Sequence, residues 1–218
     1  EIFTAEEGKG RPTIITTVTE EELAVIRQNC TVVQVKGEES WRDYRHHSGD
    51  LLNLSGKKYA TQRNHISRFK REYPDYRFEV LGPENLPAVT AFMESFDISR
   101  HGDEPEALEE RDKTLEVLRN YGTYGMEGGV LFVGDKVVAF SIGGVVGDTL
   151  YVHIEKGDTD YLGVYQMMTN EFNQRFTRPD TAFNNREEDM GNEGLRKAKQ
   201  AYHPVKLLPK YTVELGIE

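Results

Sequence analysis

The N-terminal part of the chain alternates between strand-like and helix-like patterns of hydrophobic and polar residues. β-branched side chains fill Thr13–Val18 and predict a strand, and Thr19 follows as the N-cap of a helix with Glu22 at the capping-box position. A second short strand is predicted at residues 30–35. These few elements bury little apolar surface on their own, so we interpret them as part of a larger domain.

Residues 55–73 place apolar side chains at helical spacing and predict an amphipathic helix. The apolar stripe consists of Tyr59, Ile66, Phe69 and Tyr73. Between residues 57 and 71 the chain also carries six basic residues and no acid, namely Lys57, Lys58, Arg63, Arg68, Lys70 and Arg71. This basic face is either the ordinary solvated side of the helix or a surface that binds phosphate or an RNA backbone.

From Tyr76 onward strands and helices follow one another without a long linker or an internal repeat. The predicted elements are a strand at 77–81, helices at 83–96 and 106–121, strands at 129–133, 137–146 and 149–154, a helix at 162–176, a strand at 181–184, a helix at 193–202 and a strand at 211–215. Gly134-Asp135 and Gly147-Asp148 predict two hairpin turns, and Gly143-Gly144 predicts a bulge or a close ligand approach within a strand. The predicted fold class is therefore α/β with a mixed α+β sheet.

Composition limits the binding partners and the cellular compartment that we expect for the protein. The 218 residues include 27 basic and 37 acidic side chains, and the net charge of −10 disfavours unspecific binding of nucleic acid or anionic lipid over the whole surface. Cys30 is the single cysteine, which excludes an internal disulfide and agrees with a reducing cytoplasm. No apolar run approaches the roughly 20 residues that span a bilayer. His46, His47 and His153 have no further ligand cluster, so no metal site is predicted.

A charged segment precedes the last predicted helix and contains Asn185, Arg186, Glu187 and Asp189. Asn, Arg and acidic residues at the start of a helix indicate a polar, transferase-like site for a charged substrate. Arg186 is the candidate cation of this site, and Glu187 and Asp189 are candidates for a base or for a contact to an ammonium group. Alternatively, Asp189 or Asn192 caps the following helix.

The helix itself carries Arg196 and Lys199 on one face, which suits contacts to a charged donor. The neighbouring stripe of Leu195, Ala198 and Tyr202 is predicted to face the core. The alternative is an ordinary surface helix whose cations lie favourably near its C-terminus.

The element order over residues 76–218 resembles the GNAT acyltransferase fold. This resemblance implies that a turn after the fourth strand opens a helix and holds the pyrophosphate of coenzyme A. The corresponding turn is Asp160-Tyr-Leu-Gly-Val-Tyr165, in which Gly163 matches the cofactor-binding glycine. Asp160 stands where an arginine or glutamine is expected, and an acid there disfavours acyl-CoA because it repels a diphosphate.

Two further motifs narrow the resemblance. Leu54-Ser-Gly-Lys-Lys-Tyr-Ala-Thr-Gln-Arg-Asn-His-Ile-Ser-Arg-Phe69 is similar to the connecting helix of the phosphatidylglycerol lysyltransferase C-terminal domain family, and the stretch from Asn185 to Pro204 is similar to its closing motif. The family has two GNAT-like halves and is related to Fem aminoacyltransferases. The resemblance implies a tandem arrangement whose first half is incomplete. Its parts are residues 1–55 as the rear of the first half, residues 56–75 as the connecting basic helix and residues 76–218 as the second GNAT-like domain.

The resemblance implies an acyl- or aminoacyl-transferase that takes aminoacyl-tRNA or another phosphate-bearing donor, with acceptor and oligomeric state left open. Without a membrane segment the chain resembles the soluble branch of the family, for which a lipid acceptor is not expected. Residues expected to bind the donor are Arg63, Asn64, Asn185, Arg196 and Lys199, and those expected in catalysis are Arg186, Glu187 and Asp189. Alternatively, Arg63 and Asn64 bridge the two halves. Acyl-CoA-dependent N-acetylation and non-catalytic ligand binding on the same scaffold are the other functions left open.

Overall fold

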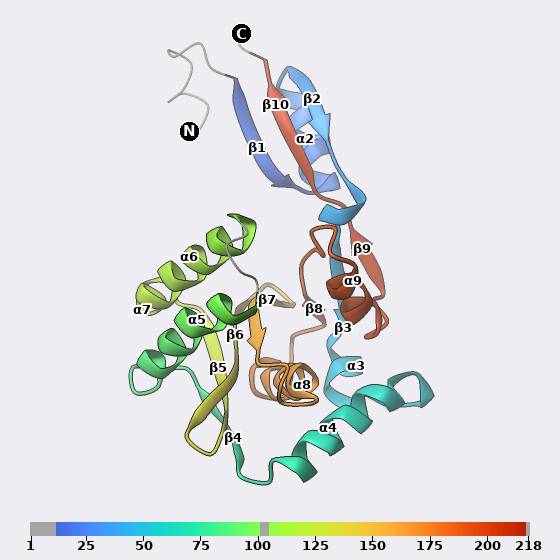
Figure 1. Ribbon diagram of the computed structural model, residues 1–218. Coiled ribbons are helices and arrows are strands. Elements are labelled where there is room, and N and C mark those ends of the chain that lie inside the picture. Colours follow the sequence, from blue (N-terminus) through green and yellow to red (C-terminus); the bar gives the residue numbers. More distant parts are fainter. Residues whose placement is uncertain (1–11, 101–104, 217–218) are drawn as a thin grey trace. The chain divides into compact units, whose positions relative to one another are not determined.

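The chain forms two compact units (Figure 1). A computed structural model describes residues 12–100 and 105–216, with side chains outside residues 96–106. The units are residues 1–45 with 186–218, here the first unit, and residues 46–185, the second unit. Compactness thus groups the C-terminal segment with the N-terminal one. The predicted division of the chain into residues 1–55, 56–75 and 76–218 refers to GNAT-like halves and not to compact units. That division stays a prediction.

The first unit contains a three-stranded antiparallel sheet with the order β1-β10-β2. Its elements are β1 (Thr13–Val18), helix α2 (Glu20–Asn29), β2 (Val32–Lys36) and β10 (Tyr211–Leu215). The strand latest in the sequence is central, because Val213 pairs with Ile15 on one side and with Val35 on the other. As predicted, Thr19 and Glu22 form a capping box at the start of α2.

The first unit also holds the elements around the charged segment. These are the 3-10 turn η1 (Glu39–Trp41), the first part of β3 (Asp43–His47), α9 (Glu193–Gln200) and β9 (Lys206–Leu208). β3 and β9 are antiparallel, with Asp43 opposite Leu208 and Arg45 opposite Lys206. The sequence did not predict β3 or β9, because strands of five and three residues with several charged side chains show no clear apolar alternation.

A mixed sheet forms the centre of the second unit, as the sequence predicted. Its strands follow the order β4 (Tyr76–Val80), β5 (Glu127–Val133), β6 (Lys136–Val146), β7 (Thr149–Gly157) and β8 (Phe183–Asn185). Strands β4 to β7 are antiparallel to their neighbours, whereas β7 and β8 are parallel. The pairing of β7 with β8 reaches only from Thr149 to Tyr151, although β7 continues to Gly157.

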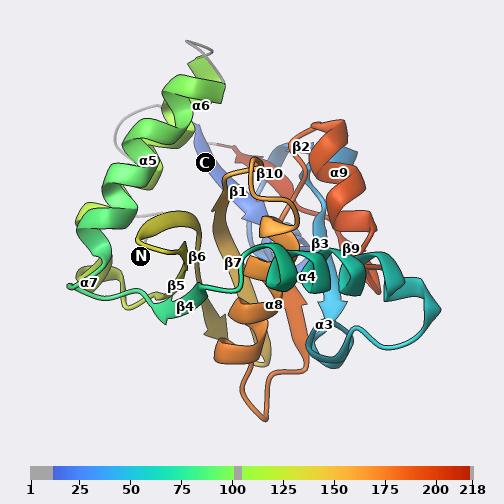
Figure 2. The same cartoon turned by 60° about the horizontal axis from the view of Figure 1, so that its bottom comes forward.

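Helices cover both faces of this sheet (Figures 1 and 2). One face carries α5 (Leu86–Arg100) and α6 (Pro105–Arg119), which the short α7 (Tyr121–Tyr124) follows. The other face carries α8 (Val164–Phe176), against which α3 (Ser48–Asn53) and α4 (Ala60–Glu72) pack, with the 3-10 turn η2 (Lys57–Tyr59) before α4. Val130 and Phe132 of β5 belong to the core that includes α5 and α6 residues, whereas Met168 of α8 lies near Gly129. Alternate residues of the strand therefore serve the two faces.

Three glycines account for turns and an irregularity that the sequence predicted. Gly134 and Gly147 have positive φ values of 56° and 58° in the two hairpin turns. Gly143 lies where the register between β6 and β7 shifts, so that His153 is the extra residue of a bulge. A Cβ atom at Gly143 would collide with the carbonyl oxygen of Tyr151, which explains why glycine occupies this position.

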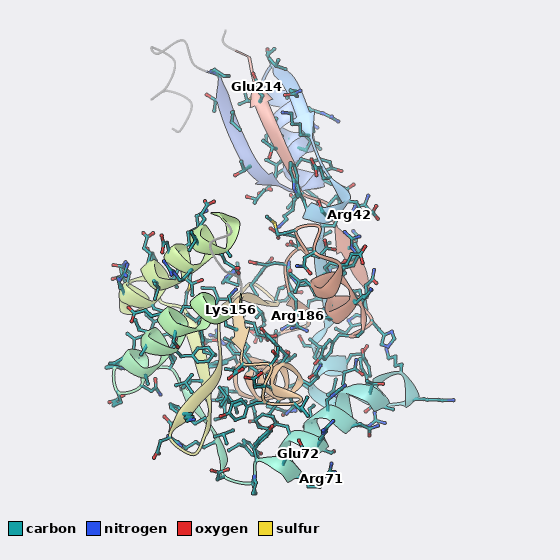
Figure 3. The ribbon with its side chains drawn as sticks, viewed as in Figure 1. Arg42, Arg71, Glu72, Lys156, Arg186 and Glu214 are labelled. Carbon is teal, nitrogen blue, oxygen red and sulfur yellow. The ribbon has the colours of Figure 1, made fainter. Side chains whose placement is uncertain are left out.

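Helix α4 and the turn before it confirm the predicted amphipathic pattern. Tyr59 and Phe69 are fully buried, and Ile66 is also buried. The basic residues of the helix are exposed, and Arg71 and Glu72 lie at its C-terminal end (Figure 3).

Candidate functional site

The charged segment forms a loop, residues 186–192, that leads into α9 in the first unit. Glu187 and Met190 have positive φ values of 55° and 50°, and Gly191 has a φ of 80°. Left-handed backbone costs a non-glycine residue about 1 kcal/mol or more and persists only where its surroundings hold it. Buried side chains of the same unit hold this loop.

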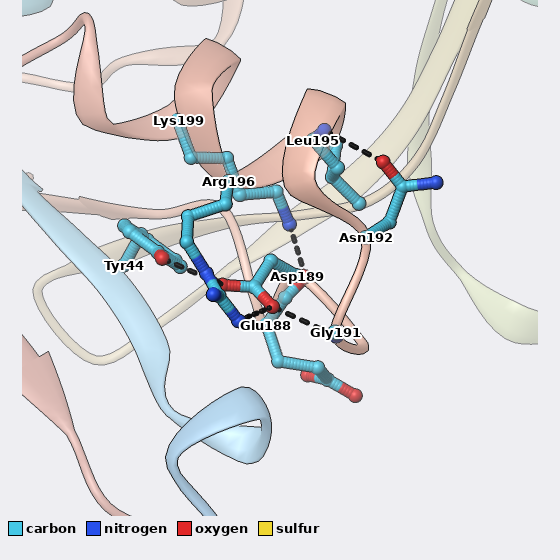
Figure 4. A network of polar contacts seen from close by, with 8 residues as sticks. All are labelled: Tyr44, Glu188, Asp189, Gly191, Asn192, Leu195, Arg196 and Lys199. Carbon is cyan, nitrogen blue, oxygen red and sulfur yellow. Dashed lines mark hydrogen bonds and ion pairs between the residues drawn. The ribbon is translucent and has the colours of Figure 1, made fainter.

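The carboxylate of Asp189 is central to the loop and is 2% exposed (Figure 4). It accepts hydrogen bonds from the Tyr44 hydroxyl at 2.7 Å, from Nε and Nη2 of Arg196 at 2.9 and 3.1 Å, and from the Gly191 N–H at 2.8 Å. The bonds from Arg196, helped by Tyr44 and Gly191, outweigh burial and hold the pKa of Asp189 well below its usual range. An ionised and fully bonded carboxylate favours a positioning role over proton transfer.

Lys199 of α9 is buried, and its ammonium group donates to the carbonyl oxygens of Arg186 and Glu188. These bonds tie the first half of the loop to the helix. The predicted core stripe of the helix was wrong in part, because Leu195 is 41% exposed and Ala198 is exposed, whereas Tyr202 is buried as expected. Loop carbonyl groups that point toward the helix require a donor on its buried face, and only a polar side chain supplies one.

Replacing Lys199 with methionine is expected to lower the free energy of unfolding by about 2 kcal/mol, because two loop carbonyl groups lose their buried donor. Methionine keeps the unbranched side chain and removes the ammonium group. The matched control is Lys197→Met on the same helix, whose side chain is 79% exposed, with an expected change within about 0.5 kcal/mol. Urea unfolding measures both variants. Equal stability of the two would show that Lys199 does not hold the loop.

Lys210 connects the loop to β3. Its ammonium nitrogen lies 2.7 Å from Oδ1 of Asp43 and 2.5 Å from Oε2 of Glu188. Burial acts to raise the pKa of Glu188, but the hydrogen bond from Lys210 outweighs it and the pKa lies below its ordinary value. Burial likewise acts to lower the pKa of Lys210, yet the two carboxylates raise it. Sequence reasoning missed Asp43 and Tyr44, since no local pattern shows which segment their strand faces.

Arg186 and Glu187 run beside β3 at the start of the loop. The Arg186 N–H donates to the Tyr44 carbonyl at 3.0 Å, and the Tyr44 N–H donates to the Glu187 carbonyl at 3.1 Å. The Arg186 guanidinium lies over the ring of Tyr202, 4.9 Å from its centroid. The first unit therefore brings together the predicted residues Arg186, Glu187, Asp189, Arg196 and Lys199.

The other predicted site residues belong to the second unit. Asn185 ends β8 and is 1% exposed. Arg63 donates from Nη1 to the carbonyl oxygens of Leu54 and Gly56, so its side chain holds the segment that precedes α4 against the helix. Asn64 is exposed on the same helix. A joint role of these residues with the loop of the first unit stays a prediction.

The turn before α8 uses most of its backbone donors within the protein. The N–H groups that already have acceptors are those of Asp160, Tyr161, Leu162 and Val164. Gly163 has a φ of 87°, and a Cβ atom there would lie 2.6 Å from the carbonyl oxygen of His65 in α4. Close packing of the turn on α4 therefore explains this glycine. Its role in cofactor binding stays a prediction.

Sequence reasoning also missed a series of hydrogen-bonded polar side chains inside the second unit. Thr169 of α8 donates to the carboxylate of Glu155 at 3.2 Å. Asn173 donates from Nδ2 to the Thr169 carbonyl at 2.8 Å and accepts at Oδ1 from Nδ2 of Asn184 at 3.0 Å. These hydrogen bonds link β7, α8 and β8 in the region where β7 and β8 separate. Helical periodicity places Thr169 in an apolar stripe and does not distinguish a hydroxyl from a methyl group.

Within residues 12–100 and 105–216, the His, Cys, Asp and Glu side chains form no group of three or more that could hold a metal ion. In the same part of the chain, each helix is too short or too polar to cross a membrane.

The second unit has the arrangement of a GNAT-like acyltransferase, in which a run of antiparallel strands precedes a parallel strand that parts from its neighbour. A GCN5-related N-acetyltransferase from Kribbella flavida shares this fold, with a TM-score of 0.51 and 14% identity over 99% of this chain and 73% of that one. The fold class predicted from the element order is confirmed.

The chain belongs to the family described as phosphatidylglycerol lysyltransferase, C-terminal, which matches residues 4–214. The predicted family is thus confirmed. L-PGS from Bacillus licheniformis has the same fold, with a TM-score of 0.68 and 17% identity over 97% of this chain and 70% of that one. A conserved protein of unknown function from Bacteroides thetaiotaomicron has a TM-score of 0.89 and 32% identity, covering 98% of this chain and 73% of its own.

An uncharacterised protein of Mycoplasmoides gallisepticum is 22% identical over 182 residues, or 81% of this chain. The chain spans 57% of the length of this curated relative. Membership of this family supports an acyltransferase-like function.

Proposed function

We propose that the chain transfers an aminoacyl group from aminoacyl-tRNA to a nucleophilic acceptor. The observation that carries this proposal is the loop of residues 186–192, which a buried ionic network holds in a costly backbone conformation. Strain of this kind is concentrated at functional sites, where the surrounding structure maintains it. The family description names a lysyl transfer, and the loop presents Arg186 and Glu187 as groups suited to such chemistry.

In the proposed reaction a hydroxyl or amine of the acceptor attacks the carbonyl carbon of the aminoacyl ester. The bond from this carbon to the 3′ oxygen of the tRNA then breaks, and the aminoacyl group ends on the acceptor. The proton of the acceptor passes to a base and from there to the leaving 3′ oxygen. We assign the base to Glu187 and stabilisation of the oxyanion to Arg186, whereas Asp189 positions the loop.

The turn before α8 favours a donor other than acyl-CoA. A pyrophosphate held at a helix N-terminus requires backbone N–H groups that point at it. Four such groups in this turn are already bonded within the protein, and Asp160 adds a negative charge. An ester of tRNA does not depend on this turn.

The exposed basic face of α4 supports a donor with a phosphate backbone. Two of the neighbouring cations form ion pairs, Arg68 with Glu72 at 2.8 Å and Lys58 with Asp50 at 3.1 Å. Both pairs are exposed and therefore weak, so phosphate groups can compete for these cations. Binding through such contacts releases counterions, and we expect it to weaken as the salt concentration rises.

The test uses a mixture of tRNAs charged with radiolabelled amino acids. Filter binding compares charged tRNA with uncharged tRNA and with acetyl-CoA, and transfer is followed as label that moves to phosphatidylglycerol vesicles or to soluble amines. We expect saturable, salt-sensitive binding of charged tRNA and movement of the label. Acetyl transfer from acetyl-CoA without any tRNA binding would contradict the proposal, as would the binding of none of these donors.

The hydrogen bonds that Asp189 accepts favour a second candidate function. In this alternative the protein has the same fold and binds a ligand but does not catalyse transfer. Asp189 and Glu188 are both held by cations, so the proposed reaction depends on Glu187 alone as its base. Binding of charged tRNA without transfer to any acceptor tested would favour this second candidate over the first.

A further inference from the structure

The second unit contains an open cavity of about 400 Å³ near the end of β4 and the start of β5. This volume lies in the range of small-molecule sites, roughly 300–1,000 Å³. Apolar side chains form one part of its wall, namely Val80, Leu81, Met126 and Phe176. Val80 is 44% exposed, so the cavity offers accessible apolar surface that a ligand with an apolar part would remove from water.

Two arginines form the charged part of the wall. Arg175 belongs to the last turn of α8, and Arg178 follows this helix. The Arg175 side chain is exposed, and its guanidinium lies 5.4 Å from the centroid of the Phe176 ring. Within residues 12–100 and 105–216 this guanidinium forms no ion pair and no hydrogen bond. Its N–H donors are therefore available to a ligand.

Glu127 lies in the same wall but neutralises only one of the two cations. Its Oε1 accepts a hydrogen bond from Nη2 of Arg178 at 2.6 Å, and its Oε2 is buried, so a ligand in the open cavity does not contact Oε2. The Arg178 side chain is 54% exposed, and its Nε and Nη1 have no partner among the described residues. Two cations and one carboxylate give the wall a net charge of +1. A concave wall of one sign of charge attracts the opposite ion.

Tyr121 adds a ring to the wall without adding charge. Burial, together with the nearby carboxylate of Glu127, raises the pKa of Tyr121 to about 12, so the phenol is neutral at physiological pH and does not repel an anion. A Cβ atom on Gly128 would lie 2.7 Å from the phenol oxygen and 2.8 Å from Cδ2 of Leu81. Glycine at this position therefore allows both side chains to line the cavity.

We propose that this cavity binds an organic monocarboxylate with an apolar tail. The carboxylate binds the guanidinium groups of Arg175 and Arg178, whose planar N–H donors suit its two oxygens, and the tail lies against Val80 and Met126. One negative charge on the ligand matches the net charge of the wall. The residues of this site are distinct from the loop of residues 186–192 and from the basic face of α4, so the proposal does not depend on the proposed transfer reaction.

The test is isothermal titration of the whole chain with hexanoate, hexanamide, acetate and inorganic phosphate, without tRNA. We expect hexanoate to bind saturably. Hexanamide lacks the charge, whereas acetate and phosphate lack the apolar tail. Each of these three is therefore expected to bind at least about 10-fold more weakly than hexanoate, a loss of about 1.4 kcal/mol. This comparison needs no variant of the protein.

A pair of matched variants tests the role of Arg175. Arg175→Gln leaves the Glu127–Arg178 pair in place and is expected to weaken hexanoate binding at least about 10-fold. Arg27→Gln makes the same change of charge at an exposed position on α2 in the first unit and is expected to leave the binding unchanged. Urea unfolding confirms that both variants are folded.

Absence of saturable binding of hexanoate up to about 10 mM would overturn the proposal, since affinities weaker than this indicate no specific site. Acetate or phosphate that binds as tightly as hexanoate would also overturn it, because the apolar wall would then contribute nothing. Equal binding of hexanoate by the wild type and by folded Arg175→Gln would do the same. These results do not bear on aminoacyl transfer, because the titrations contain no donor.

Discussion

Replacing Glu187 with glutamine is expected to reduce aminoacyl transfer by at least about 100-fold, the usual contribution of a general base. Glutamine has nearly the same shape as glutamate but does not accept the acceptor's proton. The neighbouring carboxylates do not replace it, because the pKa values of Glu188 and Asp189 are both held low by cations. The measurement is the rate at which label leaves charged tRNA for the acceptor, under saturating donor.

The control for this variant is Glu193→Gln, at the start of α9, whose side chain is 82% exposed. We expect this control to transfer at the wild-type rate. Donor binding by Glu187→Gln is expected to stay within about 3-fold of the wild type, so that the loss concerns the chemical step. A rate for Glu187→Gln equal to that of the control would show that the base lies elsewhere.

Replacing Asp189 with asparagine is expected to lower the free energy of unfolding by about 3 kcal/mol, near the lower end for breaking a buried ion pair. The lower end applies because the Arg196 side chain is 39% exposed, so water can solvate its guanidinium once the carboxylate is removed. Asparagine also turns an amide donor toward groups that are themselves donors. Arg196 is thus more than the surface cation that its helical position predicts, since it neutralises a buried carboxylate.

Acid unfolding provides a second readout for Asp189. The pKa of Asp189 is lowered in the folded protein, so its stabilising contribution is present above the unfolded pKa of about 4 and is lost as the pH falls toward the folded pKa. Between about pH 5 and pH 2 the stability of the wild type is therefore expected to fall more steeply than that of Asp189→Asn. The exposed residue Asp180 provides the control, and Asp180→Asn is expected to follow the wild type. Parallel acid curves for Asp189→Asn and the wild type would contradict the bonding described for this carboxylate.

The sequence predicts best those features that depend on neighbours in the chain. The stripe of α4 follows from helical spacing, and Tyr59 and Phe69 are buried as expected. The hairpin turns follow from Gly134 and Gly147, because few other residues adopt positive φ at low cost. The closing motif of residues 185–204 likewise predicts the position of the charged loop from the sequence alone.

What the sequence does not predict depends on segments that are distant along the chain. Tyr44 bonds to Asp189 across 145 residues, and the pattern around neither residue specifies the other. The same reason explains the error in α9, where Lys199 is buried and Ala198 is exposed. Hydrophobicity ranks the two residues in the opposite order, and only the loop carbonyl groups reverse that order.

The central position of β10 has a consequence for synthesis on the ribosome. The second unit is one continuous stretch, residues 46–185, and all of it is synthesised before the last strand. β1 and β2 pair with β10 and not with each other, so their ladder cannot form until residues 211–215 have followed. Until then two strands with unpaired edges are open to other nascent chains. Termination just before Tyr211 is expected to leave the second unit folded and to make the product prone to aggregate through its first strands.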